Sequence, residues 1–278
     1  MIFFLYSMKW KFFKKLLTLL KLMNMDETNV IEAIRSGKVF MINPYHFRGR
    51  FMTQQEMIAI FDQFDAFWKY EGEPCEEKPH AILKSGLHSN GFISCKEVLQ
   101  YPALCTLFAN EMVKHASNQF LKTGLGCVDV VVSSAYSAIN IGFEIARLIS
   151  EKHNPKVEYV VVEKDQAGNP TNIRGSINPN KRVLVVNELM TTGDGSTWET
   201  KKAVQTCNGE GNPMPEILEP SFVLVHRSND LVLLDGSKVY PVFHFDIVNF
   251  KPEECPYCKV GSKAIKPKVD QNWKLLHS

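Results

Sequence analysis

A turn rich in hydroxyl groups and glycine follows an apolar run in the second half of the chain. The run spans Val183 to Val186, the polar pair Asn187 and Glu188 follows, and the turn contains Thr191, Thr192, Gly193, Gly195 and Ser196. The residues from 197 to 207 can form a helix after this turn. Backbone N–H groups at a helix N-terminus bind phosphate, and a carboxylate accepts hydrogen bonds from sugar hydroxyls. This segment therefore predicts a site for a phosphorylated sugar, the alternative being an ordinary strand-to-helix turn.

A second group of polar residues lies between positions 81 and 94. It contains the run Leu83, Lys84, Ser85 and Gly86, with Ser89 and Phe92 further along. A lysine next to small polar residues suits an anion. The alternative interpretation is a surface hairpin with a solvated lysine.

Two serines end another apolar run. Ser133 and Ser134 follow Val128 to Val132, and Ser137 and Ala138 come next. Serine hydroxyls and backbone amides in such a turn can donate hydrogen bonds to a second anionic group. Packing of a strand against the following helix explains the same pattern nearly as well.

The segment from 163 to 180 is rich in glycine, asparagine and proline, which predicts a mobile loop. Its cations are Lys164 and Arg174. A solvated loop lysine is one interpretation of Lys164, and a cation that faces a bound anion is the other.

The pair Cys255 and Cys258 forms a CxxC motif, which supplies two of the four ligands that a tetrahedral zinc site needs. The chain has no second CxxC, so His226, His244 or Cys207 would have to complete a site. We expect a reduced pair in a turn, with zinc unlikely, and we assign no metal ligand directly.

A parallel sheet is the element that would position these residues. Apolar strands are expected at 128–132, 157–162, 183–186 and 222–226, and helices at 25–36, 53–70, 99–116, 138–150 and 197–207. Strands alternating with helices predict an α/β fold whose parallel sheet is covered on both faces. Ligands bind beyond the carboxyl ends of such strands, where Glu188 and Ser134 both stand.

Composition limits the classes of function. The 278 residues are 45% hydrophobic and 22% charged, which indicates a well-filled core. The first 24 residues carry five lysines and no acid, leaving 27 basic and 30 acidic residues in the remainder. This mildly acidic body excludes a nucleic-acid footprint in the overall charge. Seven cysteines without a secretory signal indicate reduced thiols and the cytoplasm.

The N-terminal stretch is apolar and basic. It can lie on a membrane surface as an amphipathic helix, but its lysines prevent it from spanning a bilayer. Alternatively Met23 or Met25 is the true start, which we favour because Asp26 begins a normal helix N-terminus. We expect a leader or upstream extension at 1–24, a main domain at 25–250 and a C-terminal tail with the CxxC at 251–278.

The segments 83–92 and 183–196 resemble the signatures of type I phosphoribosyltransferases, and most closely those of orotate phosphoribosyltransferases. The resemblance implies a parallel sheet flanked by helices, with a small hood made from N- and C-terminal segments. It implies transfer of phosphoribose from phosphoribosyl pyrophosphate (PRPP) to a nucleobase, with orotate the best choice. Mg²⁺ is the implied cofactor, bound through PRPP, and a homodimer is the implied assembly, with no nucleic-acid partner.

Each site residue then acquires an implied role. Glu188 and Asn187 hold ribose hydroxyls, the 191–196 turn holds the 5-phosphate, and Lys164 faces the leaving pyrophosphate. Lys84, with Ser85 and Gly86, contacts PRPP or the base, and Phe92 forms a wall beside the base. The turn that contains Ser133 and Ser134 donates to pyrophosphate.

Three departures from the family pattern leave rivals open. Asn187 replaces one carboxylate of the family's acidic pair, Ser137 and Ala138 replace paired glycines, and Asp194 stands in the phosphate turn. We expect Asp194 to cap the following helix. The rivals are a non-catalytic PRPP- or nucleotide-binding regulator, and an enzyme that uses another base or cleaves a ribosyl bond with water.

Overall fold

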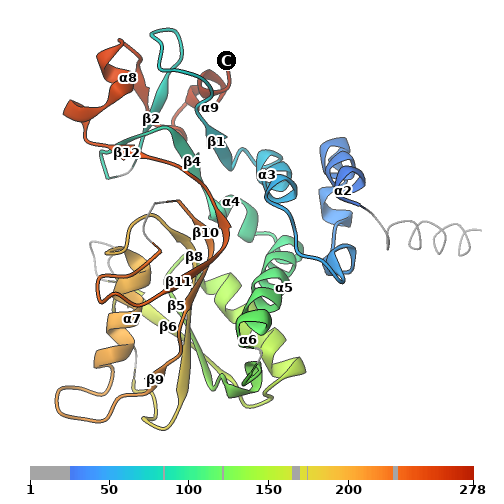
Figure 1. Cartoon of the computed structure of the whole chain (residues 1–278), viewed down its shortest axis with the longest axis vertical. Helices are drawn as coiled ribbons and strands as arrows, with labels where there is room; N and C mark the ends of the chain where they lie inside the picture. The colour runs from blue at the N-terminus through green and yellow to red at the C-terminus, as the bar shows by residue number, and fades with distance from the viewer. Residues whose placement is uncertain (1–25, 84, 121, 165–169, 174, 228–230) are drawn as a thin grey trace, which may run out of the picture.

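A computed structural model describes residues 26–83, 85–120, 122–164, 170–173, 175–227 and 231–278. Figure 1 shows a lower part built around a large sheet and an upper part, the hood, that contains the C-terminal end of the chain. The residues from 1 to 25 lie outside the described part, and so does every expectation for the leader segment. Among the described residues, no helix has the length and apolar character needed to cross a membrane.

The lower part contains a seven-stranded sheet in the described residues, with the order β11-β10-β8-β5-β6-β7 and β9 paired to β8. Its strands are β5 (Val130–Ser134), β6 (Glu158–Lys164), β7 (Pro170–Ile173), β8 (Arg182–Met190), β9 (Glu216–Ile217), β10 (Ser221–His226) and β11 (Val239–His244). All pairings are parallel except that of β6 with β7. The predicted parallel α/β sheet is confirmed.

Helices cover both faces of this sheet, and alternate residues of each central strand point to opposite sides. Val131 and Leu184 pack in the cluster with helices α5 (Pro102–Gln119) and α6 (Ile139–Lys152). Their neighbours Val130 and Val183 pack instead with α7 (Ser196–Thr206). Burial on both faces explains why these strands are continuous apolar runs (Figure 1).

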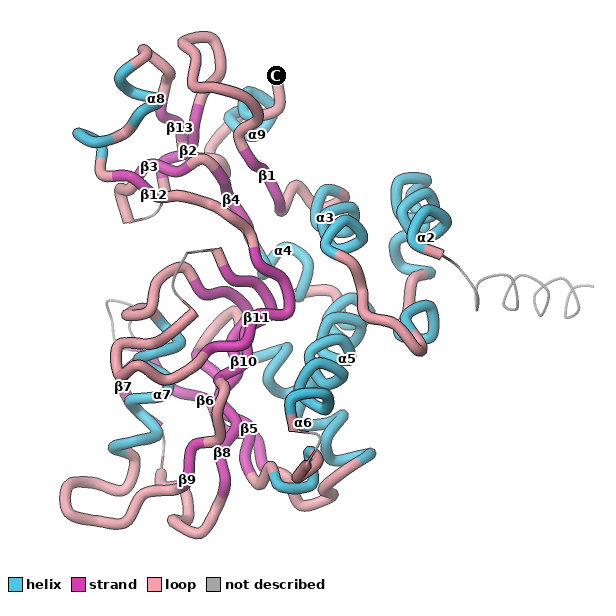
Figure 2. Tube along the Cα trace, in the orientation of Figure 1, coloured by secondary structure: helices cyan, strands magenta, loops and turns pink. Residues whose placement is uncertain are grey.

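The hood combines segments that lie far apart in the sequence. Its four-stranded sheet has the order β12-β3-β2-β13, and β1 pairs with β4 beside it (Figure 2). The strands are β1 (Phe67–Lys69), β2 (His80–Ile82), β3 (His88–Ser89), β4 (Gly91–Ile93), β12 (Asn249–Phe250) and β13 (Ala264–Ile265), accompanied by helices α8 (Pro256–Lys259) and α9 (Asn272–Leu276). The expected hood of N- and C-terminal segments is therefore present.

The remaining helices lie beside these two parts (Figure 1). They are α2 (Glu27–Ala33), α3 (Gln54–Asp62) and α4 (Cys95–Leu99), with short π- or 3₁₀-turns at Ile34–Lys38, Val39–Met41, Pro44–Phe47, Leu125–Cys127 and Pro252–Glu254. Asp26 caps α2 by accepting a hydrogen bond from the Asn29 N–H, as its position predicted. Pro102 is the first residue of α5.

The helix expected at 53–70 is shorter than predicted. It ends at Asp62, and Phe67 and Trp68 belong to strand β1. Asp65 adopts a left-handed conformation between them, with φ of 51°. Large aromatic residues also favour strands, so their spacing was compatible with either structure.

The segment 163–180, expected to be a loop, is partly a hairpin. Strand β7 pairs antiparallel with β6, with Val162 opposite Ile173, and Ile173 is buried. Arg174 and the residues 165–169 lie outside the described part.

The C-terminal segment from 251 packs into the hood. Strand β13 pairs with β2, and the Trp68 Nε1–H donates to the Leu276 carbonyl at 2.6 Å. Ile265 and Leu276 are buried in a cluster with Trp68. The last residues of the chain thus complete the part of the molecule that begins with β1.

Candidate functional site

The predicted phosphate turn connects the end of β8 to the start of α7, at the carboxyl edge of the sheet. Helix α7 begins after Gly195, and no side chain caps it in the described structure. The first N–H groups of a helix have no partner within the helix, so this end can accept an anion. The turn residues Thr191 to Ser196 are all half-buried or exposed.

The expectation for Asp194 was wrong. The capping position belongs to Gly195, one residue later, and Asp194 is exposed. Its carboxylate therefore does not occupy the helix end, where it would compete with a phosphate.

Gly193 allows a close approach between the phosphate turn and the segment after β10. A β-carbon at this position would lie 2.6 Å from the Val232 carbonyl oxygen. Real side chains do not reach backbone oxygens at such a distance, so only glycine fits here. The residues around Val232 thereby brace one side of the turn.

Asn187 organises the site from inside the protein. Its side chain has no exposed surface, and its Nδ2 donates to Ser196 Oγ at 2.9 Å and to Thr197 Oγ1 at 3.0 Å. Its Oδ1 accepts from Ser134 Oγ at 3.3 Å and from the Glu188 N–H at 3.0 Å. Asn187 therefore ties β5, β8 and α7 together, and its direct contact with ribose stays a prediction.

The two predicted serines also bond within the protein. Ser133 Oγ lies 2.8 Å from the Tyr159 hydroxyl, which itself donates to the Ile139 carbonyl. Ser134 donates to Asn187, and both serines are buried. The following peptide, Ala135–Tyr136, is cis. Because both serine hydroxyls already form hydrogen bonds within the protein, any contact of this turn with pyrophosphate would come through its backbone or its later residues.

Glu188 is half-buried and stands beside the base of the hood. The Cys95 thiol, at the start of α4, donates to the Glu188 carbonyl oxygen at 3.4 Å. Burial raises the pKa of Cys95, the Glu188 charge raises it further, and the charge of Arg227 lowers it. These three residues consequently lie together where the sheet meets the hood.

Arg227 is a functional candidate that sequence reasoning missed. It follows β10 directly, and its N–H donates to the Met190 carbonyl at 3.0 Å, which places it beside Thr191. The residue is only 7% exposed, and its Nε and Nη1 find no hydrogen-bond partner among the described residues. Burial lowers the pKa of Arg227 to about 10, so it stays charged at neutral pH. The sequence could have indicated this residue, because Arg227 is a cation that directly follows the apolar run of β10, at the end of the strand where ligands bind.

Of the predicted lysine run, Ser85 and Gly86 lie in the turn between β2 and β3. The Gly86 N–H donates to the Leu83 carbonyl, Gly86 has φ of 85°, and Ser85 is exposed. Lys84 lies outside the described residues. Phe92, on β4, meets Trp273 of α9 edge-to-face at 6.0 Å between ring centroids.

The remaining predicted cation, Lys164, is the last residue of β6. That strand is adjacent to β5, so its end faces the same edge of the sheet as Ser134. The structure describes only the backbone of Lys164, so the role of its side chain stays a prediction.

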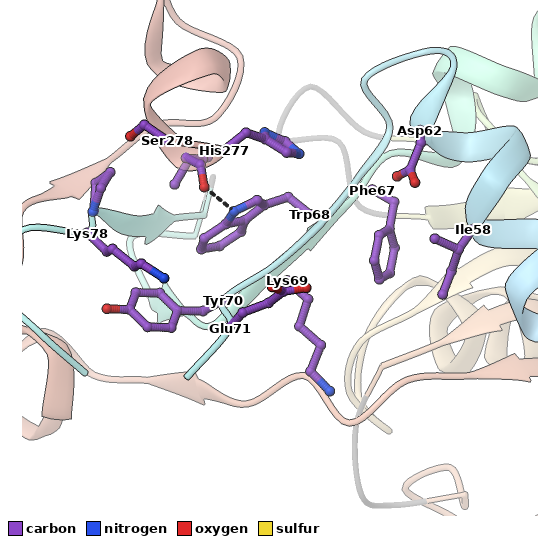
Figure 3. Close-up of a pocket in the computed structure, with 12 residues that line it drawn as sticks. Ile58, Asp62, Phe67, Trp68, Lys69, Tyr70, Glu71, Lys78, His277 and Ser278 are labelled. Atoms are coloured by element: carbon purple, nitrogen blue, oxygen red, sulfur yellow. Dashed lines mark hydrogen bonds between the residues drawn. The ribbon is translucent and has the colours of Figure 1, made fainter. Parts of the chain in front are cut away.

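A separate pocket of about 330 Å³ lies in the hood and is lined by β1, the loop before β2 and the C-terminal residues (Figure 3). Its residues include Trp68, Tyr70, Lys78 and His277. No residue expected to bind substrate lines it. The pocket lies where the C-terminal residues pack against β1, and it is not the predicted substrate site.

Comparison with known protein sequences finds relatives that are named orotate phosphoribosyltransferase. No family model matches the chain. It is 34% identical over 217 residues to the orotate phosphoribosyltransferase of Pelotomaculum thermopropionicum, covering 78% of this chain and 97% of that protein. It is 30% identical over 211 residues to that of Chlorobaculum parvum, covering 76% and 93%. The solved orotate phosphoribosyltransferase of Aeropyrum pernix is 18% identical, covers 66% of this chain and 91% of its own, and has a TM-score of 0.47.

The two sequence relatives are matched over nearly their full length. The recognition made from the segments 83–92 and 183–196 is thus confirmed. The chain belongs to the orotate phosphoribosyltransferase family.

Proposed function

We propose that the protein transfers phosphoribose from PRPP to orotate and releases pyrophosphate. The observation that carries this proposal is the uncapped start of α7, directly after the strand that bears Glu188. It offers N–H groups to a 5-phosphate and a carboxylate to the attached ribose at the same edge of the sheet. The family membership of the chain supports orotate as the acceptor.

In this proposal the reaction proceeds through charge stabilisation at the sugar carbon. Positive charge develops on C1 of the ribose as pyrophosphate departs, and a nitrogen of the base attacks C1. Glu188 holds the ribose hydroxyls, and its negative charge favours the developing cation. The turn from Thr191 to Ser196 fixes the phosphate, so that C1 and the base are held in position for attack.

Arg227 is the residue we assign to the anionic base or to the departing pyrophosphate. Its backbone is hydrogen-bonded to Met190, next to Thr191, and its buried guanidinium carries two nitrogen atoms without a partner among the described residues. A bound anion would satisfy these groups and offset the cost of burying the charge. Lys84, which lies between β2 and β3 in the sequence, and Lys164, at the end of β6, remain the other proposed cations.

The residues at this edge suit Mg²⁺ bound mainly through the substrate. Mg²⁺ prefers carboxylate oxygens together with substrate phosphates. Glu188 supplies a carboxylate here, whereas Asn187 turns its amide into the protein. When bound, the ion would neutralise part of the pyrophosphate charge.

The direct test is turnover. The full chain is incubated with PRPP, Mg²⁺ and orotate, uracil or adenine in turn, and pyrophosphate release is measured. We expect release with orotate alone. Release with another base, and none with orotate, would contradict the choice of acceptor.

A regulator that binds PRPP without turnover is the second candidate. The replacement of a carboxylate by Asn187 favours it, because the site loses one negative charge near the reacting carbon. Binding of PRPP measured by calorimetry, without release of pyrophosphate from any base, would establish this alternative.

We also propose that the protein is a cytoplasmic homodimer. The structure describes all seven cysteines as thiols, which suits a reducing compartment. Phe40, Tyr45 and Phe143 are exposed apolar surface of the kind found at subunit contacts. Light scattering on the purified chain tests the assembly, and a monomeric mass would contradict it.

A further inference from the structure

Four potential metal ligands converge in the hood, far from the phosphate turn. His80 on β2, His88 on β3, and Cys255 and Cys258 at the two ends of the α8 turn place their ligand atoms within 4.8 Å of one another. The cysteines stand more than 160 residues after the histidines, so the hood fold brings the two pairs together.

The spacing of these atoms matches a tetrahedral zinc site. His80 Nε2 lies 3.0 Å from His88 Nδ1, 3.5 Å from Cys255 Sγ and 3.6 Å from Cys258 Sγ. Cys258 Sγ lies 3.2 Å from His88 Nδ1. Zn–N and Zn–S bonds of usual length give ligand–ligand edges of about 3.3 to 3.8 Å in a tetrahedron. The four atoms therefore already stand close to the corners that one ion requires.

A second hydrogen bond orients His80 toward the cluster. Ser262 Oγ donates to the Lys78 carbonyl at 2.6 Å, so it accepts from His80 Nδ1 at 2.8 Å. The proton of His80 is then on Nδ1, and the lone pair of Nε2 points at the cysteines. Such outer hydrogen bonds are the usual partners of metal-binding histidines.

The site is largely shielded from solvent. His80 and Cys255 have no exposed surface, His88 is buried, and Cys258 is the least buried of the four. The Tyr257 ring stacks on His80 at 5.3 Å between centroids. Two thiols and two imidazoles in so small a space are costly without a common partner, because each brings polar atoms into the interior.

We propose that His80, His88, Cys255 and Cys258 bind one structural zinc ion. Four protein ligands leave no position for water or substrate, which is the arrangement of structural and not catalytic zinc sites. On binding, both cysteines lose their thiol protons to solvent and ligate as thiolates.

The zinc ion would join the C-terminal segment to the hairpin of β2 and β3. His80 and His88 stand on either side of the turn that contains Ser85 and Gly86, which is the turn assigned to substrate. The hood strands are only two or three residues long, and their buried cluster is small. Small cores of this kind are commonly stabilised by a metal.

The ligands differ from those that the sequence suggested for completing a CxxC site. His226 and His244 lie on β10 and β11, where their Nδ1 atoms are 2.9 Å apart. Cys207 follows α7 and contacts Asn208. All three residues belong to the large sheet and its helices and not to the hood. The ligands that accompany the CxxC cysteines are therefore His80 and His88.

The test is the metal content of the full chain, purified without added metal or chelator. We expect about one zinc per chain by elemental analysis, and loss of most of it in Cys258→Ser. Cys75→Ser is the matched control, because Cys75 is also in the hood but contacts the Tyr70 hydroxyl and none of the four ligands. The control should keep its zinc.

A second measurement covers the case in which a variant fails to fold. The wild-type chain, stripped of metal and given Co²⁺, should show the visible absorption of a tetrahedral thiolate site. A wild-type chain without zinc that also fails to take up Co²⁺ would overturn the proposal. A Cys255–Cys258 disulfide found by mass spectrometry in the freshly purified protein would overturn it too.

These outcomes are independent of the proposed transferase reaction. Zinc content and the Co²⁺ spectrum are read without substrate, so an inactive protein could still confirm the metal site. If the protein is active, we expect Cys258→Ser to raise the KM for substrate more than Cys75→Ser does.

Discussion

At the scale of single residues, Arg227 combines the cost of a buried charge with a proposed role in binding an anion. A buried guanidinium with unsatisfied nitrogen atoms destabilises a fold by several kcal/mol unless it finds an anion. We therefore expect Arg227→Met, which keeps the volume and removes the charge, to leave the melting temperature unchanged or higher. Turnover with orotate should fall about 100-fold, as when one stabilising donor is removed from an active site.

Thermal denaturation and steady-state kinetics on the same preparation test this pair of effects. Adding PRPP or orotate should raise the melting temperature of the wild type more than that of the variant. If Arg227→Met lost stability and activity together, a purely structural role for the arginine would explain both.

Glu188 carries the charge assigned to the ribose. Glu188→Gln keeps the shape and removes the charge, so we expect kcat/KM to fall about 100-fold. Glu199→Gln is the control, because Glu199 is another half-buried acid in the first turn of α7. It should retain nearly full activity. Equal losses in both variants would indicate a general effect of charge near α7.

Asn187 tests whether the missing carboxylate limits the reaction. In Asn187→Asp the hydroxyls of Ser196 and Thr197 can rotate to donate, and Ser134 and the Glu188 N–H already do. Four donors would keep the new carboxylate ionised. We expect kcat to rise up to about tenfold, equivalent to ~1.4 kcal/mol of the barrier. An unchanged kcat at an unchanged melting temperature would show that charge at 187 is not limiting.

At the scale of elements, an ion pair between described residues joins the segment after β10 to helix α7. Lys201, which is nearly fully buried, places its Nζ 2.8 Å from Asp235 Oδ2, and Ser237 Oγ donates to Asp235 at 2.6 Å. The same segment contains Val232, which contacts the phosphate turn at Gly193. The ion pair therefore supports the site from outside.

This pair predicts a dependence of stability on pH. Desolvation alone would raise the pKa of Asp235, but hydrogen bonds from Lys201 and Ser237 lower it to about 2. Because the folded pKa lies below the unfolded one, the stabilisation is present above about pH 4 and is lost as the pH falls to about 2. Asp235→Asn should cost about 1 to 2 kcal/mol at pH 7, after allowance for solvent screening.

Urea denaturation of both proteins between pH 2 and pH 7 measures this effect. The difference between wild type and Asp235→Asn should shrink toward zero at the acid end. A difference that stayed constant with pH would mean that the carboxylate charge is not its source.

The sheet could be predicted from the sequence because its strands carry their own signal. Val130 to Val132 and Val183 to Val186 are buried on both faces, and such strands appear as unbroken apolar runs. The strand-to-helix turn from 191 to 196 was equally visible, since Gly193 and Gly195 follow such a run, and its binding of phosphate stays a prediction. Strand β7 was missed because it has only four residues, and the proline, threonine and asparagine before Ile173 give no apolar run.

The hood could not be predicted in the same way. Strand β2 pairs with β13, and β3 pairs with β12, across about 160 to 180 residues of sequence. Strands of two or three residues are too short to show a periodic pattern. The cluster that contains His80 and Cys255 could not be predicted for the same reason, because its members come together only in the folded hood.

At the scale of the whole molecule, the protein consists of a large, deeply buried sheet and a hood with a small core of its own. The sheet cluster gathers residues from α2 to β11, whereas the hood cluster is centred on Trp68, Tyr257 and Leu276. Local stability follows the amount of buried apolar contact. The turn between β2 and β3, which we assign to substrate, thus lies in the less stable part, and the turn proposed to bind phosphate lies in the more stable one.

Hydrogen exchange measured by mass spectrometry tests this division. Without ligand, peptides from β2, β3 and β13 should exchange much faster than peptides from β5, β8 and β10. Ribose 5-phosphate should protect the 191–196 turn alone, because its phosphate needs only the start of α7. PRPP with Mg²⁺ should in addition protect residues 133–138 and the β2–β3 turn, since its pyrophosphate extends beyond the ribose. If ribose 5-phosphate protected the hairpin as strongly as PRPP does, the hood would be responding to closure of the whole molecule, and the separate assignment of the two turns would be wrong.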